Sequence, residues 1–280
     1  MSTSVCLIGQ IRVPEVTWSS FKKNVLDVFD ADLILCLHVD DTTDRNNEFY
    51  KNAKHIFEYE ETTGCWASSF DRMNPGWRDM VDIPGDWIGT IKEPVERAST
   101  GGILLFLRWF LYQNVKNLDL GDRIIVSRSD YLWTAPHPKL DLDHIWLPNG
   151  EFHGGLPDRH YVIPRIYLKH VLTMGQVENW FETRNDMVRL LNYRLSQGWG
   201  HFMYNEESFS YIRFIERGLI EKVGLFPFVM HLVDKDRKPR YPTEVDSSRE
   251  TVTWPFTIEH THIQCDMFVG IVKKVDGIID

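Results

Sequence analysis

Cysteine and long apolar runs are scarce in this sequence. The four cysteines lie far apart among 280 residues and form no Cys-x-x-Cys pair. This spacing argues against a zinc site or a disulfide framework and favours structural thiols in a reducing compartment. No stretch reaches the roughly 18 apolar residues of a membrane span, and the N-terminus lacks a charged segment followed by an apolar core. We therefore expect a soluble, cytoplasmic protein without a transmembrane segment.

An excess of positive charge is also absent. The 40 Asp and Glu residues outnumber the 31 Lys and Arg residues, and the net charge of -9 argues against nucleic acid as the main partner. A local basic cleft could still hold a nucleotide. Internal repeats are missing, and a chain with 43% hydrophobic residues can bury a substantial core. We expect residues 1–280 to form a single large domain or two closely packed lobes.

Short apolar runs and one helical pattern alternate at the start of the chain. Ser4 to Ile11 and Ala31 to Val39 are typical of buried strands, and the apolar positions between Glu15 and Phe29 recur at helical spacing. Such a strand, helix and strand form a right-handed βαβ unit. His55 to Glu60 alternates and adds a third strand. The pattern predicts an α/β fold with a mostly parallel central sheet flanked by helices.

The main candidate site follows a strand near the middle of the chain. Arg123 to Val126 is the β-branched run of an interior strand, and an aromatic loop with Pro136 and Pro138 comes soon after it. Open α/β sheets bind ligands beyond the carboxyl ends of their strands. We therefore expect Asp130, flanked by Arg128, to point into a binding site.

The tip of the first strand offers a second set of polar groups. Gln10 and Arg12 supply an amide and a guanidinium that suit a base or a phosphate. The second and third glycines of a dinucleotide fingerprint are missing after Gly9, so a Rossmann cofactor is not indicated. A surface loop that happens to contain Arg12 explains the segment equally well.

An apolar helix over Ile103 to Val115 precedes the central strand. Ser99 or Thr100 can cap it, and the free N–H groups of such a helix start attract anions such as a diphosphate. Arg108 lies on this buried helix and needs an acidic or phosphate partner. It is therefore either part of a structural ion pair or a ligand contact.

A second wall of the site is indicated further along. Gly154 and Gly155 allow a tight turn and a close approach of the backbone to a ligand. Asp158, Arg159 and His160 follow at once. Asp158 and Arg159 could equally form an ordinary salt bridge.

The second half of the chain carries two helices and a strand. Tyr167 to Leu191 is predicted to be helical with Trp180 and Phe181 packing inward, and Leu225 to Val233 is predicted to be one strand. Asn205 is expected to cap another helix. Two acids, Glu206 and Glu207, occupy its first turn, where acids are common because of the helix dipole.

These segments, in this order, resemble the GT-A-like nucleotide-sugar glycosyltransferases. The likeness lies in the GQIR strand tip, the IIVSRSDYLW segment, the Gly-Gly turn followed by Asp-Arg-His, and the Asn-Glu-Glu-Ser helix start. More narrowly, the chain resembles the small cytosolic glycosyltransferases of chloroviruses, which include a xylosyltransferase. The resemblance covers about residues 4–235, and its motifs are short.

The resemblance implies a function and a division of the chain. Residues 1–135 would form a Rossmann-like half that binds the nucleotide sugar, and residues 136–280 would form the half that binds the acceptor. The expected reaction is inverting transfer of a sugar, xylose from UDP-xylose in the narrowest form, onto a glycan hydroxyl in glycoprotein glycan synthesis. The expected compartment is then the cytoplasm of a host cell.

The resemblance also implies roles for individual residues. The family's base would correspond to Glu206 or Glu207, with Asp158 as a rival. The metal would be Mn²⁺ or Mg²⁺, held by Asp130 and His231, although a buried core histidine explains His231 equally well. The family's first Asp is replaced by Arg128 in the Ser-Arg-Ser-Asp tip, so Asp130 alone would bind a metal weakly and Arg128 could take over part of the charge. The donor-binding residues would be Gln10, Arg12, Arg128, Ser129, Asp130, Gly154 and Gly155.

Two other functional classes stay open. A lectin-like module could stack sugars on Trp66, Trp77 and Trp87, which lie in the turn-rich segment from Cys65 to Gly89. Burial of these indoles at the edge of the fold is the alternative. A metal-dependent phosphohydrolase or nucleotidyltransferase would use Asp130, Asp158 and a basic lip on a phosphate. An inert structural protein is the remaining alternative.

Overall fold

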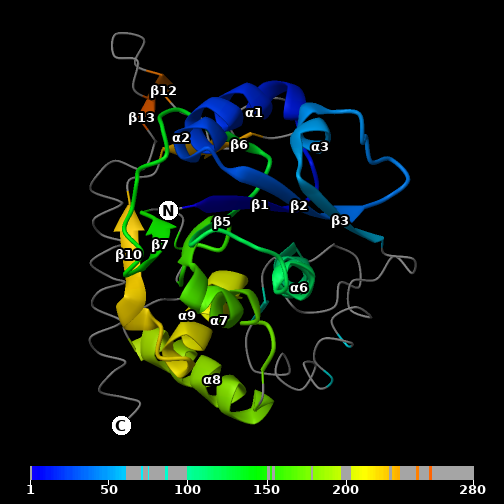
Figure 1. The fold of residues 1–280 in the computed structure, drawn as a ribbon. Coiled ribbons are helices and arrows are strands. Elements are labelled where there is room, and N and C mark those ends of the chain that lie inside the picture. The colour runs from blue at the N-terminus through cyan, green and yellow to red at the C-terminus, as the bar shows by residue number, and fades with distance from the viewer. Residues whose placement is uncertain are drawn as a thin grey trace.

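A seven-stranded, mostly parallel sheet forms the centre of this α/β protein (Figure 1). The computed structural model describes residues 2–60, 71, 75, 86–87, 100–149, 152, 155–177, 179–196, 203–226, 229–233, 244–245 and 252–253. The strands of the sheet, in spatial order, are β10 (Val223–Phe226), β7 (Ile145–Pro148), β8 (Tyr161–Pro164), β5 (Arg123–Ser127), β1 (Thr3–Gly9), β2 (Asp32–Val39) and β3 (His55–Glu60). Only β8 in this sheet runs antiparallel to its neighbours β5 and β7.

The predicted βαβ unit is present at the start of the chain. Helix α1 (Pro14–Phe21), a π-helical segment (Lys22–Leu26) and α2 (Asp27–Phe29) connect β1 to β2. Pro14 occupies the first helical turn, where its missing N–H costs nothing. The short helix α3 (Glu48–Asn52) then leads to β3. The first three strands were thus predicted to within about two residues at each end.

Helices cover both faces of the sheet, as Figure 1 shows with α1 to α3 on one face and α6 (Thr100–Val115) on the other. Side chains of β1 alternate between two clusters. Val5 and Leu7 pack on the α1 side, whereas Cys6 and Ile8 pack on the α6 side. Burial on both faces explains why β1 is apolar throughout. Cys6 and Cys36 are free and buried, and burial raises the pKa of the Cys6 thiol to about 12, as expected for structural thiols.

The order in which strands are added to the sheet reverses at β1. From β1 the chain moves outward through β2 to β3, and it then returns to place β5 on the other side of β1. Gly121 permits this return because a Cβ there would lie 2.4 Å from the backbone of Ser2. The carboxyl ends of β1 and β5 therefore meet at a topological switch point, the position where open α/β sheets bind ligands.

The predicted helix over Tyr167 to Leu191 was wrong as a single element. A 3-10 turn (Arg165–Tyr167) and α7 (Leu168–Leu172) are followed by an irregular turn, and α8 (Trp180–Ser196) begins only after it. Arginines from elsewhere in the sequence bind the carbonyl groups of this turn, as described below. The inward packing of Phe181 was also wrong, because Phe181 is 68% exposed.

The predicted strand over Leu225 to Val233 is divided between two sheets. β10 extends the main sheet, whereas β11 (Met230–Leu232) pairs antiparallel with β6 (Tyr131–Trp133). The segment after Asp130 was predicted to be a loop, and its strand pairing depends on a partner about 100 residues away that no local pattern reveals. The remaining elements are α9 (Glu206–Glu216), a 3-10 turn (Ile220–Lys222), β4 (Asp86–Trp87) with β9 (Met203–Tyr204), and β12 (Glu244–Val245) with β13 (Val252–Thr253).

Two further predictions concern a membrane span and the residues around Trp66 and Gly154. In the part that the structure describes, no helix has both the length and the apolar character needed to cross a bilayer. Trp66 and Trp77 lie outside the described residues, as does Gly154.

Candidate functional site

The tips of β1 and β5 are joined by hydrogen bonds at the switch point. The hydroxyl of Ser129 donates to the carbonyl oxygen of Gln10 over 2.9 Å, and the amide N of Arg12 donates to the Ser129 hydroxyl over 3.1 Å. The Arg12 guanidinium donates to the Gln10 side-chain oxygen over 3.3 Å and lies 3.9 Å from the Asp130 carboxylate. Residues predicted separately from two strand ends therefore lie in one place.

Asp130 is held by Arg128 through two hydrogen bonds. Nε of Arg128 donates to Oδ1 over 2.9 Å, and Nη2 donates to Oδ2 over 2.5 Å, the parallel geometry that makes guanidinium–carboxylate pairs strong. The Asp130 side chain is only 4% exposed. Burial opposes the charge of Arg128, but the attraction of Asp130 outweighs this effect and raises the pKa of Arg128. Both carboxylate oxygens of Asp130 are thus already occupied by a cation.

The segment before β8 lies beside the end of β5. Nδ1 of His160 is 2.9 Å from the Ser127 hydroxyl. Nε of Arg159 lies 3.5 Å from the Asp158 carboxylate, so the predicted salt bridge is present. Repulsion from the nearby Arg159 partly opposes the rise in the pKa of Arg128. The segment with Asp158, Arg159 and His160 therefore lies near the Arg128–Asp130 pair, and its role as a second wall of a binding site stays a prediction.

The buried Arg108 has an acidic protein partner. It donates one hydrogen bond to Oε1 of Glu206 and another to the backbone carbonyl of Asp158, and its guanidinium lies 4.9 Å from the centre of the Tyr161 ring. Burial raises the pKa of Glu206, and the nearby carboxyl groups of Asp158 and Glu207 raise it further, whereas Arg108 opposes this rise. Because a guanidinium stays protonated and the pKa of Arg108 is itself raised in part by Glu206, we assign the pair as ionised. Of the two roles predicted for Arg108, the structural ion pair is the one observed.

The start of α9 carries this acid because Asn205 caps the helix. Oδ1 of Asn205 accepts a hydrogen bond from the Ser208 amide over 2.8 Å, as the sequence predicted. Gly155 packs directly against the same helix start, since a Cβ on Gly155 would lie 1.9 Å from the carbonyl oxygen of Glu207. The close approach that Gly155 permits is therefore to α9, and a contact between Gly155 and a donor stays a prediction.

The described residues do not fit Mn²⁺ or Mg²⁺. At nucleotide sites such cations are usually bound by one or two carboxylates together with water and phosphate oxygens, but the two oxygens of the Asp130 side chain are bound by Arg128. His231 lies on β11, where burial lowers its pKa, and Val233 of the same segment donates its amide to the Asp130 carbonyl over 2.9 Å. Among the described side chains, no cluster of three or more His, Cys, Asp or Glu residues could hold a metal ion.

Comparisons with known proteins identify no family. No protein-family model matches the chain, and no curated protein sequence is significantly similar to it. Among solved structures, the fold is similar to the apo crystal structure of mouse xyloside xylosyltransferase 1. The identity is 11%, the match covers 80% of this chain and 84% of the mouse chain, and the TM-score is 0.41. This likeness is too remote to assign a function.

Sequence reasoning missed a buried histidine pair behind β5. Nδ1 of His137 is 2.8 Å from the Pro138 carbonyl, and Nε2 of His137 is 3.2 Å from Nε2 of His160. A carbonyl only accepts, so His137 donates from Nδ1 and accepts at Nε2 from His160, which in turn accepts at Nδ1 from the Ser127 hydroxyl. Burial lowers the pKa of both imidazoles, that of His137 to about 4. Both rings are therefore neutral near neutral pH.

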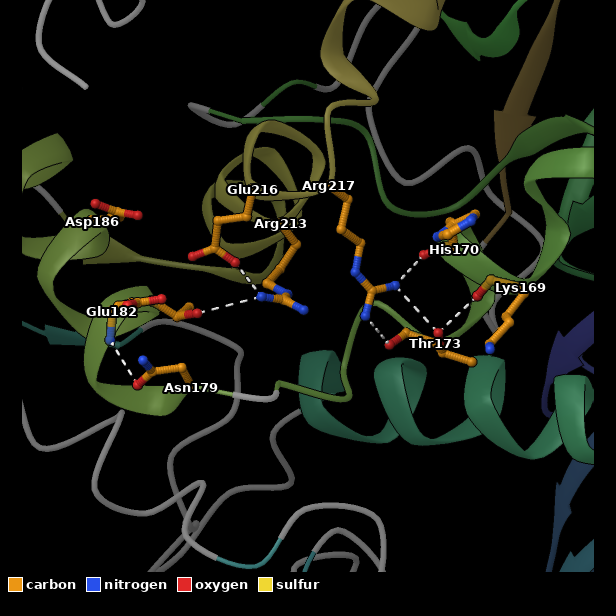
Figure 2. A pocket seen from close by; sticks show the side chains of 10 residues that line it. Lys169, His170, Thr173, Asn179, Glu182, Asp186, Arg213, Glu216 and Arg217 are labelled. Carbon is orange, nitrogen blue, oxygen red and sulfur yellow. Dashed lines mark hydrogen bonds and ion pairs between the residues drawn. The ribbon is translucent and has the colours of Figure 1, made fainter. Parts of the chain in front are cut away.

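A separate cavity of about 440 Å³ lies between α7, α8 and α9 (Figure 2). Arg213 and Arg217 line it, together with acids of α8 and α9 such as Glu216. Nε of Arg213 donates to the Met174 carbonyl over 3.0 Å, and Nη2 of Arg217 donates to the Thr173 carbonyl over 2.9 Å. These cations bind backbone carbonyl groups at and beyond the C-terminal end of α7, where a helix runs out of its own donors. They account for the break between α7 and α8 that the sequence pattern did not show.

Proposed function

We propose that this protein is a glycosyltransferase that uses a nucleoside diphosphate sugar. The observation that supports this most is the convergence of Gln10, Arg12 and Arg128 at the switch point between β1 and β5. Sheets of this type bind nucleotides at that position. An amide suits a base or a ribose, and guanidinium groups suit phosphates.

The geometry suggests how transfer would proceed. The acceptor oxygen forms a bond to the anomeric carbon of the donor sugar, while the bond from that carbon to the diphosphate oxygen breaks. The nucleoside diphosphate leaves with the electron pair, and arginines at the sheet edge stabilise its growing negative charge. A carboxylate takes the proton of the acceptor hydroxyl. One such base, opposite the leaving group, gives inversion at the anomeric carbon.

Asp158 is the base that we favour among the three predicted acids. Glu206 serves as the counter-ion of Arg108, and removing it from that pair would leave a buried charge alone. Asp158 lies near both Glu206 and the end of β5, but its carboxylate is paired with Arg159 at the site rather than with the buried Arg108. Glu207 is buried at the start of α9 and is the second choice.

The finer parts of the proposal depend on the resemblance to GT-A-like enzymes. They are the GT-A organisation with a donor half and an acceptor half in one domain, the donor UDP-xylose, and a glycan hydroxyl as the acceptor. No described residue distinguishes uridine from guanosine or xylose from glucose.

A two-step experiment tests the proposal. Thermal shift against a panel of nucleotide sugars should raise the melting temperature for one donor class, because a ligand that binds only the folded state stabilises it. Transfer of labelled sugar from that donor to a panel of glycans should then be lost in Asp158→Asn, while Asp186→Asn, on the distant α8, should retain it. Absence of any donor-dependent shift would rule out the transferase. Release of free sugar without an acceptor would instead indicate a hydrolase.

A further inference from the structure

We propose that the sheet edge binds the donor diphosphate through arginine side chains alone, without a divalent cation. This inference rests on the proposed function and concerns the same site. It starts from the disagreement between the described residues and the metal site that the resemblance implies.

Among the side chains that the structure describes at this edge, guanidinium groups outnumber carboxylates. Arg12, Arg128 and Arg159 lie close to the carboxylates of Asp130 and Asp158. The Arg108–Glu206 pair behind them is neutral as a unit. A diphosphate would thus meet a site of opposite charge before any metal is added.

The Arg128–Asp130 pair orients a guanidinium rather than a carboxylate toward a ligand. Arg128 uses Nε and Nη2 to bind Asp130. Within the described part of the chain its Nη1 donates no hydrogen bond, and the side chain retains 17% exposure. A guanidinium has five N–H donors in a rigid plane. Asp130 therefore fixes the plane of Arg128 and leaves the Nη1 donors for phosphate oxygens.

Arg12 and Arg159 both lie near the Arg128–Asp130 pair. Arg12 comes from the tip of β1, and its side chain is 53% exposed. Arg159 comes from the segment before β8 and lies near enough to repel Arg128. The carboxylates of Asp130 and Asp158 already offset part of the repulsion between Arg128 and Arg159. A bound diphosphate would reduce that repulsion further, whereas a divalent cation would add to it.

The test measures binding of UDP by isothermal titration calorimetry, first in excess EDTA and then in excess MnCl₂. Binding of GDP, ADP and CDP is measured in the same way. If one of them binds more tightly than UDP, it replaces UDP in the comparisons that follow. We expect dissociation constants in the two buffers that agree within about threefold. UDP should bind more tightly than UMP, because the second phosphate contacts the arginines.

Two variants and a matched control complete the test. Arg12→Gln and Arg159→Gln should each weaken UDP binding by roughly ten- to a hundredfold, which is the effect of losing one charge-assisted hydrogen bond. Each variant should also reduce the difference in affinity between UDP and UMP. Arg189→Gln is the control. It removes the same charge, but the Arg189 side chain lies on α8 and is 57% exposed. It should bind UDP as the unchanged protein does. Melting temperatures show that each variant is folded.

The possible failures are distinguishable. UDP binding that requires MnCl₂ would overturn the arginine-only site and leave the glycosyltransferase proposal standing. UDP binding in EDTA that neither arginine variant weakens would also overturn it. If no nucleoside diphosphate binds in either buffer, the proposed function itself fails, and this inference fails with it.

Discussion

The ion pair between Arg108 and Glu206 gives the most specific stability prediction. Both side chains are buried, and Arg108 also donates to the Asp158 carbonyl. Removing one member of a buried pair leaves an uncompensated charge, which costs about 3–5 kcal/mol of unfolding free energy. We therefore expect Glu206→Gln and Arg108→Met each to destabilise the protein by about that amount.

Removing both charges should cost less than removing either one. The double variant Arg108→Met/Glu206→Leu contains no isolated charge and leaves mainly the Asp158 carbonyl without its donor, a loss of about 1–3 kcal/mol. The assay is urea denaturation monitored by tryptophan fluorescence. The dependence of the unfolding free energy on urea concentration is compared between variants, because a shift in midpoint reports a change in stability only when this slope is unchanged. Glu48→Gln is the control, because its pair with Lys51 is exposed and should contribute about 0.5 kcal/mol or less.

One result would refute the reasoning. If Glu206→Gln kept the stability of the unchanged protein and abolished only sugar transfer, Glu206 would be a free catalytic acid rather than a counter-ion. A double variant less stable than both single variants would likewise show that the two charges do not compensate one another.

Three further predictions concern parts of the fold outside that pair. Because unfolded histidine has a pKa of 6.5 and His137 in the folded state has one of about 4, the unfolded chain gains the proton first. The free energy of unfolding should therefore fall as the pH is lowered from 6.5 to about 4, by on the order of 3 kcal/mol for His137 alone. His137→Gln should flatten that profile in urea titrations at several pH values, and an unchanged slope would contradict the buried pair with His160. Gly155→Ala should destabilise by more than about 2 kcal/mol, because the new Cβ overlaps the Glu207 carbonyl; a normal melting temperature would show that this contact is not tight. Arg217→Met should cost about 1–3 kcal/mol through loss of its hydrogen bonds to the carbonyls of His170, Thr173 and Gln176. Hydrogen exchange of the turn after α7 is the measurement, and unchanged protection would be the opposing result.

Local patterns in the sequence predicted the strands and caps of this fold. The apolar runs at β1, β2 and β5 are continuous because both faces of the sheet are covered, and Asn205 caps α9 with its own side chain. The need of Arg108 for an acidic partner also followed from its place on an apolar helix.

What the sequence could not show depends on partners far along the chain. Glu206 lies 98 residues after Arg108, and β6 pairs with a strand about 100 residues away. The turn after α7 is held by Arg217, 44 residues later. The grouping of Arg12 with Asp130 likewise requires the order of strands in the sheet, which no local periodicity contains.

The most direct test of the whole account is a crystal structure of the chain with UDP bound in the absence of divalent metal. The account predicts the diphosphate between the ends of β1 and β5, with its oxygens within hydrogen-bond distance of Nη1 of Arg128 and of the Arg12 guanidinium. A nucleotide bound in the cavity between α7, α8 and α9, with the Arg128–Asp130 pair left untouched, would contradict it.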